Sequence, residues 1–301
     1  MANLRDIRNR ISSIKNTQQI TKAMKMVAAA KLRKAQQRMT ATRPYASKMR
    51  EVVARLVSAN NSDFKLLRQP EETNKVLLIV VGSDKGLCGG FNNNLFRSVE
   101  SYIQEKLSSF NEAGKLELIT IGKKAGAYFK KREYSVVETH PGFFDDLNYE
   151  ATSDIMESAS ASFADGTYDS VFISFNEFKT VISQNRVIDE VLPIKTEALT
   201  SETEKAGDAK KAEAITDYIY EPDADSILKE MLPVHLNMQL WRAVLDSNAS
   251  EQGARMAAMD NATENAKDLE QELKLRYNQA RQSAITTEIS EIVSGAAALE
   301  G

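Results

Sequence analysis

The residues best placed to do chemistry lie in a glycine-rich segment, residues 82–90, which directly follows an apolar run at 75–81. Nucleotide-binding α/β proteins have a phosphate loop after the first strand, where backbone N–H groups at a helix start attract anions. This segment matches neither G-x-x-x-x-G-K-[ST] nor G-x-G-x-x-G. We therefore favour a tight turn or a partner contact, with a nucleotide-binding α/β protein as an alternative.

Other candidate catalytic groups are few. Cys88 could be a nucleophile at a helix start, but the sequence identifies no base for it, so a small buried residue is the preferred interpretation. His140 and His235 lack a metal-binding spacing, and Asp145 and Asp146 fit loop or capping roles. We expect no catalytic residue, cofactor or metal in this chain. A single cysteine excludes internal disulfides and fits a reducing compartment.

The middle of the chain alternates strand and helix patterns. Apolar, β-branched runs predict strands at 75–81, 116–121, 134–138 and 169–175, and helices are expected near 92–108, 123–132 and 148–164. This alternation predicts an α/β domain with a mostly parallel sheet. Further expectations are a hairpin around 183–186 that joins 180–182 to 187–192, a polar loop at 199–214 and a last strand at 215–220.

Glycine and proline, the strongest helix breakers, are concentrated in that middle segment. No glycine precedes Gly82, no proline precedes Pro44, and the 68 residues after Pro233 contain three glycines and no proline. We predict two long helices flanking one folded domain, with boundaries at 1–60, 61–221 and 222–301. Because one helix enters the domain and the other leaves it, they must run antiparallel if they pair. Asp223 or Asp225 is the expected cap of the last helix.

The first long helix follows a heptad pattern. Alternate steps of three and four from Leu4 to Leu56 reach sixteen positions, of which twelve are apolar. The polar positions that cluster in this series are Gln18, Thr21 and Lys25. A shifted stripe is available there through Ile20, Met24 and Val27. We therefore predict a coiled-coil seam with one discontinuity. The matching stripe of the last helix is Ala262, Ala266, Leu269, Leu273, Tyr277, Ala280 and Ala284.

The two helices differ in length. At about 1.5 Å per residue, a helix over 3–57 spans roughly 80 Å and one over 223–299 roughly 115 Å, so the last helix should overhang by roughly 30 Å. The apolar residues of that overhang include Ile292, Val293, Gly295, Ala296 and Leu299. Such a tip favours an enclosing partner, and a frayed terminus is the alternative.

Charge is strongly asymmetric along the chain. Residues 1–50 carry 13 Lys or Arg and one acid, Asp6, although the whole chain has a net charge of −3. No aromatic residue precedes Tyr45 to stack on bases, and a coiled-coil seam is narrower than a membrane-binding face. The imbalance favours an acidic protein partner, with a basic coiled-coil nucleic-acid-binding protein as an alternative. The longest apolar runs are far shorter than the roughly 20 residues that span a bilayer, and no signal-peptide core opens the sequence.

Three separate segments of the sequence resemble one known family. Residues 7–11 and 16–31, including Asn16-Thr17-Gln18-Gln19-Ile20-Thr21-Lys22-Ala23-Met24, are similar to the amino-terminal signature of gamma subunits of F-type rotary ATP synthases, of the bacterial type. Residues 285–298 resemble the carboxy-terminal signature of that family, and residues 82–90 resemble its glycine-rich middle segment. The resemblance extends over essentially the whole chain in colinear order.

The resemblance implies a mechanical and non-catalytic role. It implies a long antiparallel coiled coil of the terminal helices and a central Rossmann-like α/β domain. The shaft would turn inside a sleeve of alternating alpha and beta subunits, which hold the catalytic sites. The α/β domain would be the foot, against epsilon and the membrane c-ring. One copy per complex, no nucleic acid, and a peripheral place at the cytoplasmic face of the bacterial cell membrane are implied too. Chloroplast relatives carry a thiol-regulated insertion near 199–214, where this chain has no cysteine.

The resemblance also implies contact residues, each of which could instead be an ordinary surface or turn residue. Contacts to the beta subunits would be Met24, Lys25, Arg255, Arg281, Gln282, Thr286 and Glu288. Foot contacts to epsilon and the c-ring would be Lys85, Gly86, Leu87, Cys88, Gly89 and Gly90. The bearing tip would be the apolar set Ile292, Val293, Gly295, Ala296 and Leu299. Lys25 stands where some relatives carry Glu, and this affects the local charge balance.

Overall fold

The structure is a computed structural model that describes residues 4–59, 64–194 and 220–300. Contacts divide the chain into two compact units. The first, the helical unit, joins Met1–Ala29 with Arg255–Gly301, and the second, the α/β unit, comprises Ala30–Ala254. Each unit is described separately below. The predicted loop at 199–214 and most of the predicted last strand at 215–220 lie outside the described residues.

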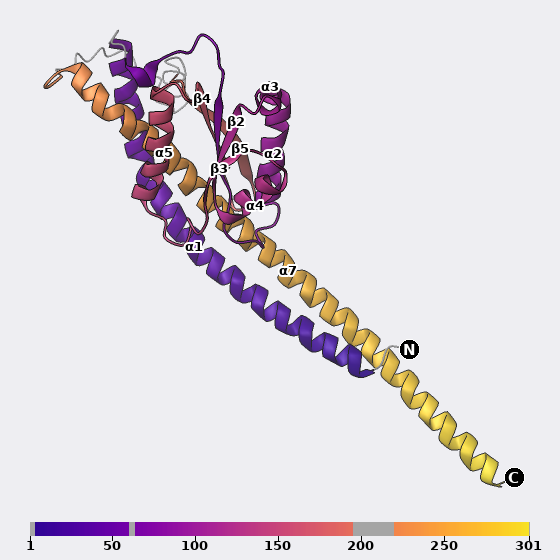
Figure 1. Cartoon of the computed structure of the whole chain (residues 1–301). Coiled ribbons are helices and arrows are strands. Elements are labelled where there is room, and N and C mark those ends of the chain that lie inside the picture. Colours follow the sequence, from indigo (N-terminus) through magenta and orange to yellow (C-terminus); the bar gives the residue numbers. More distant parts are fainter. Residues whose placement is uncertain (1–3, 60–63, 195–219, 301) are drawn as a thin grey trace. The chain divides into compact units, whose positions relative to one another are not determined.

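Two long helices, α1 (Leu4–Ala59) and α7 (Ala224–Glu300), run through both units (Figure 1). Pro44 and Pro233 are accommodated inside them. The expected cap of α7 is confirmed at Asp223, whose Oδ1 accepts the backbone N–H of Ser226 at 2.8 Å. A carboxylate at this position satisfies an otherwise unpaired N–H group and faces the positive end of the helix dipole.

The α/β unit is built on a five-stranded sheet in the order β3-β2-β1-β4-β5. Its strands are β1 (Val76–Val81), β2 (Leu116–Ile121), β3 (Val136–His140), β4 (Ser170–Phe178) and β5 (Gln184–Leu192). The first four are parallel, and β5 pairs antiparallel with β4. The predicted α/β class with a mostly parallel sheet is therefore confirmed.

Every residue of β1 is buried, because helices cover both faces of this sheet. One face packs on α2 (Phe91–Lys106) and α4 (Lys123–Lys131). The other packs on α5 (Tyr149–Ala164), α1 and α7. Figure 1 shows α2 and α5 on opposite sides of the strands. Two short elements, α3 (Ser108–Glu112) and the 3-10 helix η1 (Lys65–Leu67), complete the unit.

The two faces read directly from the alternation of β1. Val76, Leu78 and Val80 point into the cluster with α2 and α4, while Leu77, Ile79 and Val81 point toward α5 and the long helices. On that second face, Met49, Val53 and Leu56 of α1 belong to the same core as Leu228, Leu232, Leu236 and Leu240 of α7. The predicted heptad positions near the end of α1 therefore hold the sheet as well as the partner helix.

The predicted hairpin exists with different strands. Its first strand is β4 itself, which extends to Phe178, and residues 180–182 lie in the turn. Thr180 and Ser183 close that turn, because each donates its backbone N–H to an oxygen of the other at 3.0 Å. The strand predicted from Thr180, Val181 and Ile182 was wrong because these residues form the turn, where Thr180 is exposed and Ile182 is 87% exposed. Strand β3 also begins two residues later than predicted.

In the helical unit, the predicted discontinuity of the seam is wrong. Gln18, Thr21 and Lys25 are all buried or half-buried, whereas Ile20 and Val27 of the alternative stripe are 59% and 57% exposed. The stripe of α7 from Ala262 to Ala284 also faces inward at all seven predicted positions. The regular three-four register therefore passes through the polar residues unchanged, and of the alternative stripe only Met24 is half-buried.

A glycine of α4 gives a test of the sheet packing. A Cβ added at Gly126 would lie 2.6 Å from Thr139 Cγ2 and 3.2 Å from Thr120 Oγ1, while one added at Gly295 of α7 meets nothing within 4 Å. Both positions are helical, so Ala brings the same gain of up to about 1 kcal/mol in helix propensity. We expect Gly126→Ala to lower the free energy of unfolding by about 1–3 kcal/mol despite that gain. Gly295→Ala is expected to leave it unchanged or slightly raised.

Urea unfolding of the purified chain, followed by circular dichroism, measures both variants. Equal effects of the two substitutions would show that α4 moves away from β3 without loss of stability.

Candidate functional site

A polar layer joins the two helices of the helical unit. The hydroxyl of Thr263 lies 2.8 Å from that of Thr21, and Lys25 Nζ lies 2.5 Å from Asp260 Oδ1. Thr21 is 8% exposed, and its hydroxyl donates to the carbonyl of Gln18 at 3.1 Å. The layer replaces apolar seam packing with directional contacts that require one register, as buried polar residues do in other coiled coils.

Lys25 is therefore paired within the chain. Its side chain is 39% exposed and that of Asp260 is 58% exposed, so the pair contributes little to stability, about 0–1 kcal/mol. Its consequence is electrostatic, because a carboxylate of the same chain compensates the ammonium charge. Met24 lies beside it, half-buried on α1.

The antiparallel register continues to the start of α1. Arg8 Nη2 donates to Tyr277 Oη at 2.8 Å, and the guanidinium lies over the same ring, with Cζ 5.7 Å from its centroid. Hydrogen bonding to Arg8 lowers the pKa of the Tyr277 hydroxyl. The contact lies one turn from Leu4, whereas α7 continues to Glu300. At about 1.5 Å per residue, α7 extends past the first described turn of α1 by roughly 30 Å, which agrees with the predicted overhang.

The overhanging part of α7 is exposed on every side over residues 285–296. Ile292 and Val293 are 70% and 62% exposed, and Gly295 and Ala296 are also exposed. The side chain of Leu299 lies outside the described residues. The predicted contact residues of this end are exposed too, namely Arg281, Gln282, Thr286 and Glu288, while Arg255 is half-buried. They form a row along one helix and are not gathered into a pocket.

The glycine-rich loop of the α/β unit is closed by its own side chains. The backbone N–H of Ser83 donates to Asn92 Oδ1 at 3.1 Å, and Asn92 Nδ2 donates to Ser83 Oγ at 2.8 Å. Asn92 lies in the first turn of α2, where a phosphate would bind in a nucleotide-binding protein. Its amide also lies 3.3 Å from Sγ of Cys88, which is 2% exposed. The expected role of Cys88 as a small buried residue is confirmed.

Asp84 fixes this loop to its neighbours. Its carboxylate accepts three backbone N–H groups, from Lys123 at 2.9 Å, Gly142 at 2.7 Å and Phe144 at 3.0 Å. Charge-assisted bonds of this kind are the stronger ones in proteins. The loop is thereby held against the start of α4 and the segment after β3.

The same loop presents an apolar side chain outward. Leu87 is 66% exposed and has a φ of 61°, a left-handed conformation that costs a residue with a Cβ about 1–2 kcal/mol. Beside it, Lys85 pairs with Asp145 at 2.7 Å, and this pair raises the pKa of the Lys85 ammonium and lowers that of the Asp145 carboxyl. A strained, exposed leucine on a rigid loop is suited to contact a partner.

Sequence reasoning missed a buried carboxylate between α1, α7 and β4. Asp246 is 2% exposed, and its Oδ1 has no hydrogen-bond partner among the described residues. Burial raises the pKa of this carboxyl to about 6. The nearby Arg242 and Arg43 lower the pKa in part, and Glu177 raises it further. Arg242 Nε lies 3.8 Å from Asp246 Oδ2, at the outer limit of an ion pair. One signal in the sequence is the i, i+4 spacing of Arg242 and Asp246.

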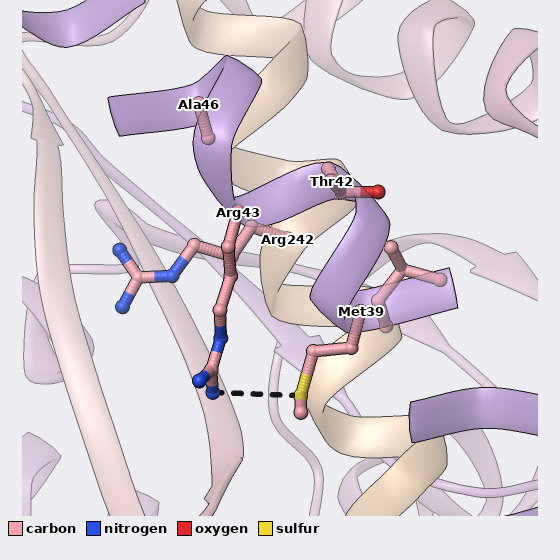
Figure 2. A pocket seen from close by; sticks show the side chains of 6 residues that line it. Met39, Thr42, Arg43, Ala46 and Arg242 are labelled. Atoms are coloured by element: carbon pink, nitrogen blue, oxygen red, sulfur yellow. Dashed lines mark hydrogen bonds between the residues drawn. The ribbon is translucent and has the colours of Figure 1, made fainter. Parts of the chain in front are cut away.

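A small cavity of about 10 Å³ lies near this carboxylate, with room for one water molecule. Met39, Thr42, Arg43 and Ala46 of α1 line it together with Arg242 and Leu245 of α7. Figure 2 shows the guanidinium of Arg43 directed toward Met39, with Nη2 3.6 Å from Sδ. The cavity is too small for a nucleotide or any other metabolite.

The two histidines, His140 and His235, contact residues of their own strand or helix. His235 is 3% exposed, burial lowers its pKa to about 4, and its Nε2 lies 2.7 Å from Gln239 Nε2. His140 lies at the end of β3, 3.2 Å from Glu138. In the part of the chain that the structure describes, no group of three or more His, Cys, Asp or Glu could hold a metal ion. None of the described helices is long and apolar enough to cross a membrane.

Known proteins resemble this chain over its whole length. A family model described as ATP synthase matches residues 3–299. The ATP synthase gamma chain of Chlorobaculum parvum is 46% identical over 301 residues, 100% of both chains. That of Salinibacter ruber is 46% identical and covers 100% of this chain and 99% of its own. This chain belongs to the ATP synthase gamma chain family. The family resemblance inferred from the sequence is confirmed.

Solved structures agree with this membership. This chain is similar to a chain in the central stalk and c-ring of the Tetrahymena thermophila mitochondrial ATP synthase, with a TM-score of 0.58 and 25% sequence identity. The match covers 81% of this chain and 99% of that one. A chain in the OSCP, F1 and c-ring assembly of Euglena gracilis matches with a TM-score of 0.67 over 98% and 94%. At 20% identity the second match supports the fold, which confirms the predicted long paired helices with a central α/β sheet.

Asp84 gives a test of the rigid loop. We expect Asp84→Ala to raise the rate at which a thiol reagent modifies Cys88 roughly tenfold or more, because three charge-assisted hydrogen bonds that hold the loop to its neighbours are lost. Cys88 is the only cysteine of the chain, so the reaction reports this loop alone. Lys85→Ala is the control, since it removes an ion pair whose side chains are 65% and 63% exposed. Equal rates in both variants would show that Asp84 does not hold the loop.

Asp246 gives a prediction of pH dependence. Its folded pKa of about 6 lies above the ordinary 3.8, so the folded chain binds the proton more tightly and this residue makes stability fall as pH rises through 4 to 6. We expect Asp246→Asn to gain about 2–3 kcal/mol relative to wild type between pH 4 and pH 8.

The difference between variant and wild type is the informative quantity, because His235, whose pKa is lowered to about 4, has the opposite slope in this range. Urea unfolding of the purified chain at several pH values measures that difference. Asp146→Asn, at an exposed aspartate, is the control. A pH-independent difference for Asp246→Asn would contradict the assignment.

Proposed function

We propose that this chain is the central rotor shaft of an F-type ATP synthase, coupling ion-driven rotation of a membrane c-ring to conformational cycling of catalytic beta subunits, in ATP synthesis and reversible hydrolysis. The observation that carries the proposal is the antiparallel pairing of α1 with α7, with α7 extending well past it, in a chain that matches gamma chains from end to end. In this proposal residues 1–60 and 222–301 are the shaft and 61–221 the foot.

The proposed partners are alpha and beta subunits as a hexameric sleeve, epsilon, and the c-ring, with one copy of this chain per complex and the chemistry on beta. The chain would be peripheral, at the cytoplasmic face of a bacterial cell membrane. The solved relatives belong to a central stalk and c-ring assembly and to an OSCP, F1 and c-ring assembly, which supports this set of partners. The closed loop at Asn92 argues against nucleotide binding by this chain.

The proposed beta contact of α1 is at Met24 and Lys25. Two properties of the helix support it. Ile20, Met26 and Val27 expose apolar surface beside the basic residues of the same helix, a combination that suits an acidic, partly apolar partner segment. Asp260 compensates Lys25 from within the chain, which limits how strongly this lysine attracts such a segment.

On α7, the proposed beta contacts are Arg255, Arg281, Gln282, Thr286 and Glu288. The last four lie near or beyond the final turns of α7 that pair with α1. All four side chains are exposed in the described structure, so they are accessible to a partner. The proposed bearing tip follows, at Ile292, Val293, Gly295, Ala296 and Leu299. An exposed apolar helix end of this length is suited to an enclosing sleeve.

The loop from Lys85 to Gly90 is the proposed contact with epsilon and the c-ring. Its rigidity and the exposed Leu87 support a docking role. Electrostatic contacts link Lys85 to Glu251 and Asp145 to Lys31, both on the long helices close to the limits of the α/β unit. An ordinary turn role, held by these contacts within the α/β unit, is the competing assignment for this loop.

Purification tests the proposal. A tagged copy of the chain, expressed in its own cells, should bring down alpha and beta subunits at one copy per three alpha-beta pairs. Deletion of residues 291–301 should weaken torque or assembly while the circular dichroism of the α/β unit stays unchanged. Recovery of the chain alone, or at equal stoichiometry with alpha and beta, would contradict the rotor role. Tight stoichiometric ATP binding by the isolated chain would favour the nucleotide-binding alternative.

A further inference from the structure

Helix α7 lies at the place where a sheet of this topology normally binds a ligand. In the order β3-β2-β1-β4-β5, the chain builds outward from β1 on one side and continues with β4 on the other. Such a reversal opens a crevice at the carboxyl ends of the two central strands. Here the pairing of β1 with β4 ends at Val80 and Ser174, so Val81 and Asn176 lie just beyond the last pair.

Two serines of α7 bind the strand ends at this crevice. Ser247 Oγ donates to the carbonyl of Val81 at 3.2 Å, and Ser250 Oγ donates to the carbonyl of Asn176 at 3.0 Å. Both serines are 0% exposed. They are three residues apart and therefore lie on one face of the helix. One helix face is thus bonded to two different strands.

The inward face of α7 changes character at this point. Leu236, Leu240 and Val244 pack in the apolar core, whereas Asp246 and Gln252 are buried polar residues. If α7 slid along its axis by one helical turn, these polar groups would enter the apolar core. Burying them there without hydrogen-bond partners would cost free energy. The serines therefore add directional bonds to an interface in which buried polar residues already disfavour other positions of the helix.

This interface contains buried polar atoms that do not contribute to its stability. Asn176 Nδ2, Asp246 Oδ1 and Gln252 Oε1 have no hydrogen-bond partner among the described residues. Unpaired buried polar atoms lower stability, and apolar side chains of similar size would bind the helix at least as tightly. What the polar groups provide is direction and register, which apolar contacts do not, because the hydrophobic effect is non-directional.

We propose that this crevice is the joint through which the sheet and α7 exchange torque, with the hydroxyls of Ser247 and Ser250 as its latch. The inference rests on the rotor function proposed above. Torque applied to the sheet would move β1 and β4 relative to α7. The two hydrogen bonds, one to each strand, oppose that motion. Both serines are positioning residues, since they act through the helix and touch no substrate.

Hydrogen exchange in the intact complex tests the latch directly. In the double variant Ser247→Ala, Ser250→Ala, we expect the amides of residues 244–252 to exchange roughly 30-fold faster, from the loss of two buried hydrogen bonds, and roughly fivefold faster in each single variant. Ser160→Ala is the matched control, because it removes a buried helical hydroxyl that has no partner among the described residues. Exchange at 244–252 that matches the control would overturn the proposal.

A second measurement asks whether the joint carries torque. Because Cys88 is buried and is the only cysteine, Glu112→Cys on the exposed α3 allows one probe to be attached to the α/β unit. With the head immobilised, the angular fluctuation of the probe in a stalled complex should be wider in the double variant than in Ser160→Ala. Before stalling, both variants should hydrolyse ATP. The single variants answer the same question if the double variant does not assemble.

The two proposals fail in different ways. If the probe does not rotate in the wild-type complex, the rotor function is wrong. If it rotates, and the double variant fluctuates no more than the control, the function stands and the latch is wrong.

Discussion

The structure depends on one constraint, the position of α7 along its own axis. This single helix serves successive partners, and each accepts only one kind of inward face. Leu228 to Val244 meet the apolar face of the sheet and α1, Ser247 and Ser250 meet strand carbonyls, and Thr263 to Tyr277 meet the amino-terminal half of α1. Because the helix is continuous, a shift that suited one partner would misplace the others.

That constraint explains why polar residues occur in two interfaces that could have been apolar. In the helical unit, Thr21 and Lys25 interrupt the apolar seam without displacing it, because Thr263 and Asp260 lie opposite them. In the α/β unit, buried hydroxyls bind the ends of β1 and β4. Apolar surfaces hold helices together but let them slide; a few directional bonds select one alignment. A shaft that must transmit rotation needs the second property as much as the first.

Much of this architecture could be predicted from the sequence, for identifiable reasons. The scarcity of glycine and proline outside the middle segment gave two long helices, and β-branched runs gave four strands with nearly correct limits. The errors have a common cause, since a local pattern does not show what lies opposite. Thr21 and Lys25 suggested a shifted seam because their partners, Thr263 and Asp260, are more than two hundred residues away. Ile182 suggested a strand because its exposure depends on the turn that carries it. Asp246 was overlooked because its i, i+4 spacing from Arg242 fits an exposed ion pair on a helix surface equally well.

The glycine-rich loop shows how a fold can keep the form of a ligand site without its use. The strand, tight turn and helix of a phosphate-binding unit are present, yet Asn92 in the first turn of the helix bonds to Ser83 of the loop, and Asp84 of the loop binds backbone N–H groups of neighbouring segments. At the neighbouring crevice, α7 takes the place of a ligand. A sheet edge that in other proteins opens and closes on a small molecule is here filled by a permanent part of the chain. Filling it removes the freedom that binding and release require, and a rigid connection between sheet and helix is the property that a rotating stalk needs.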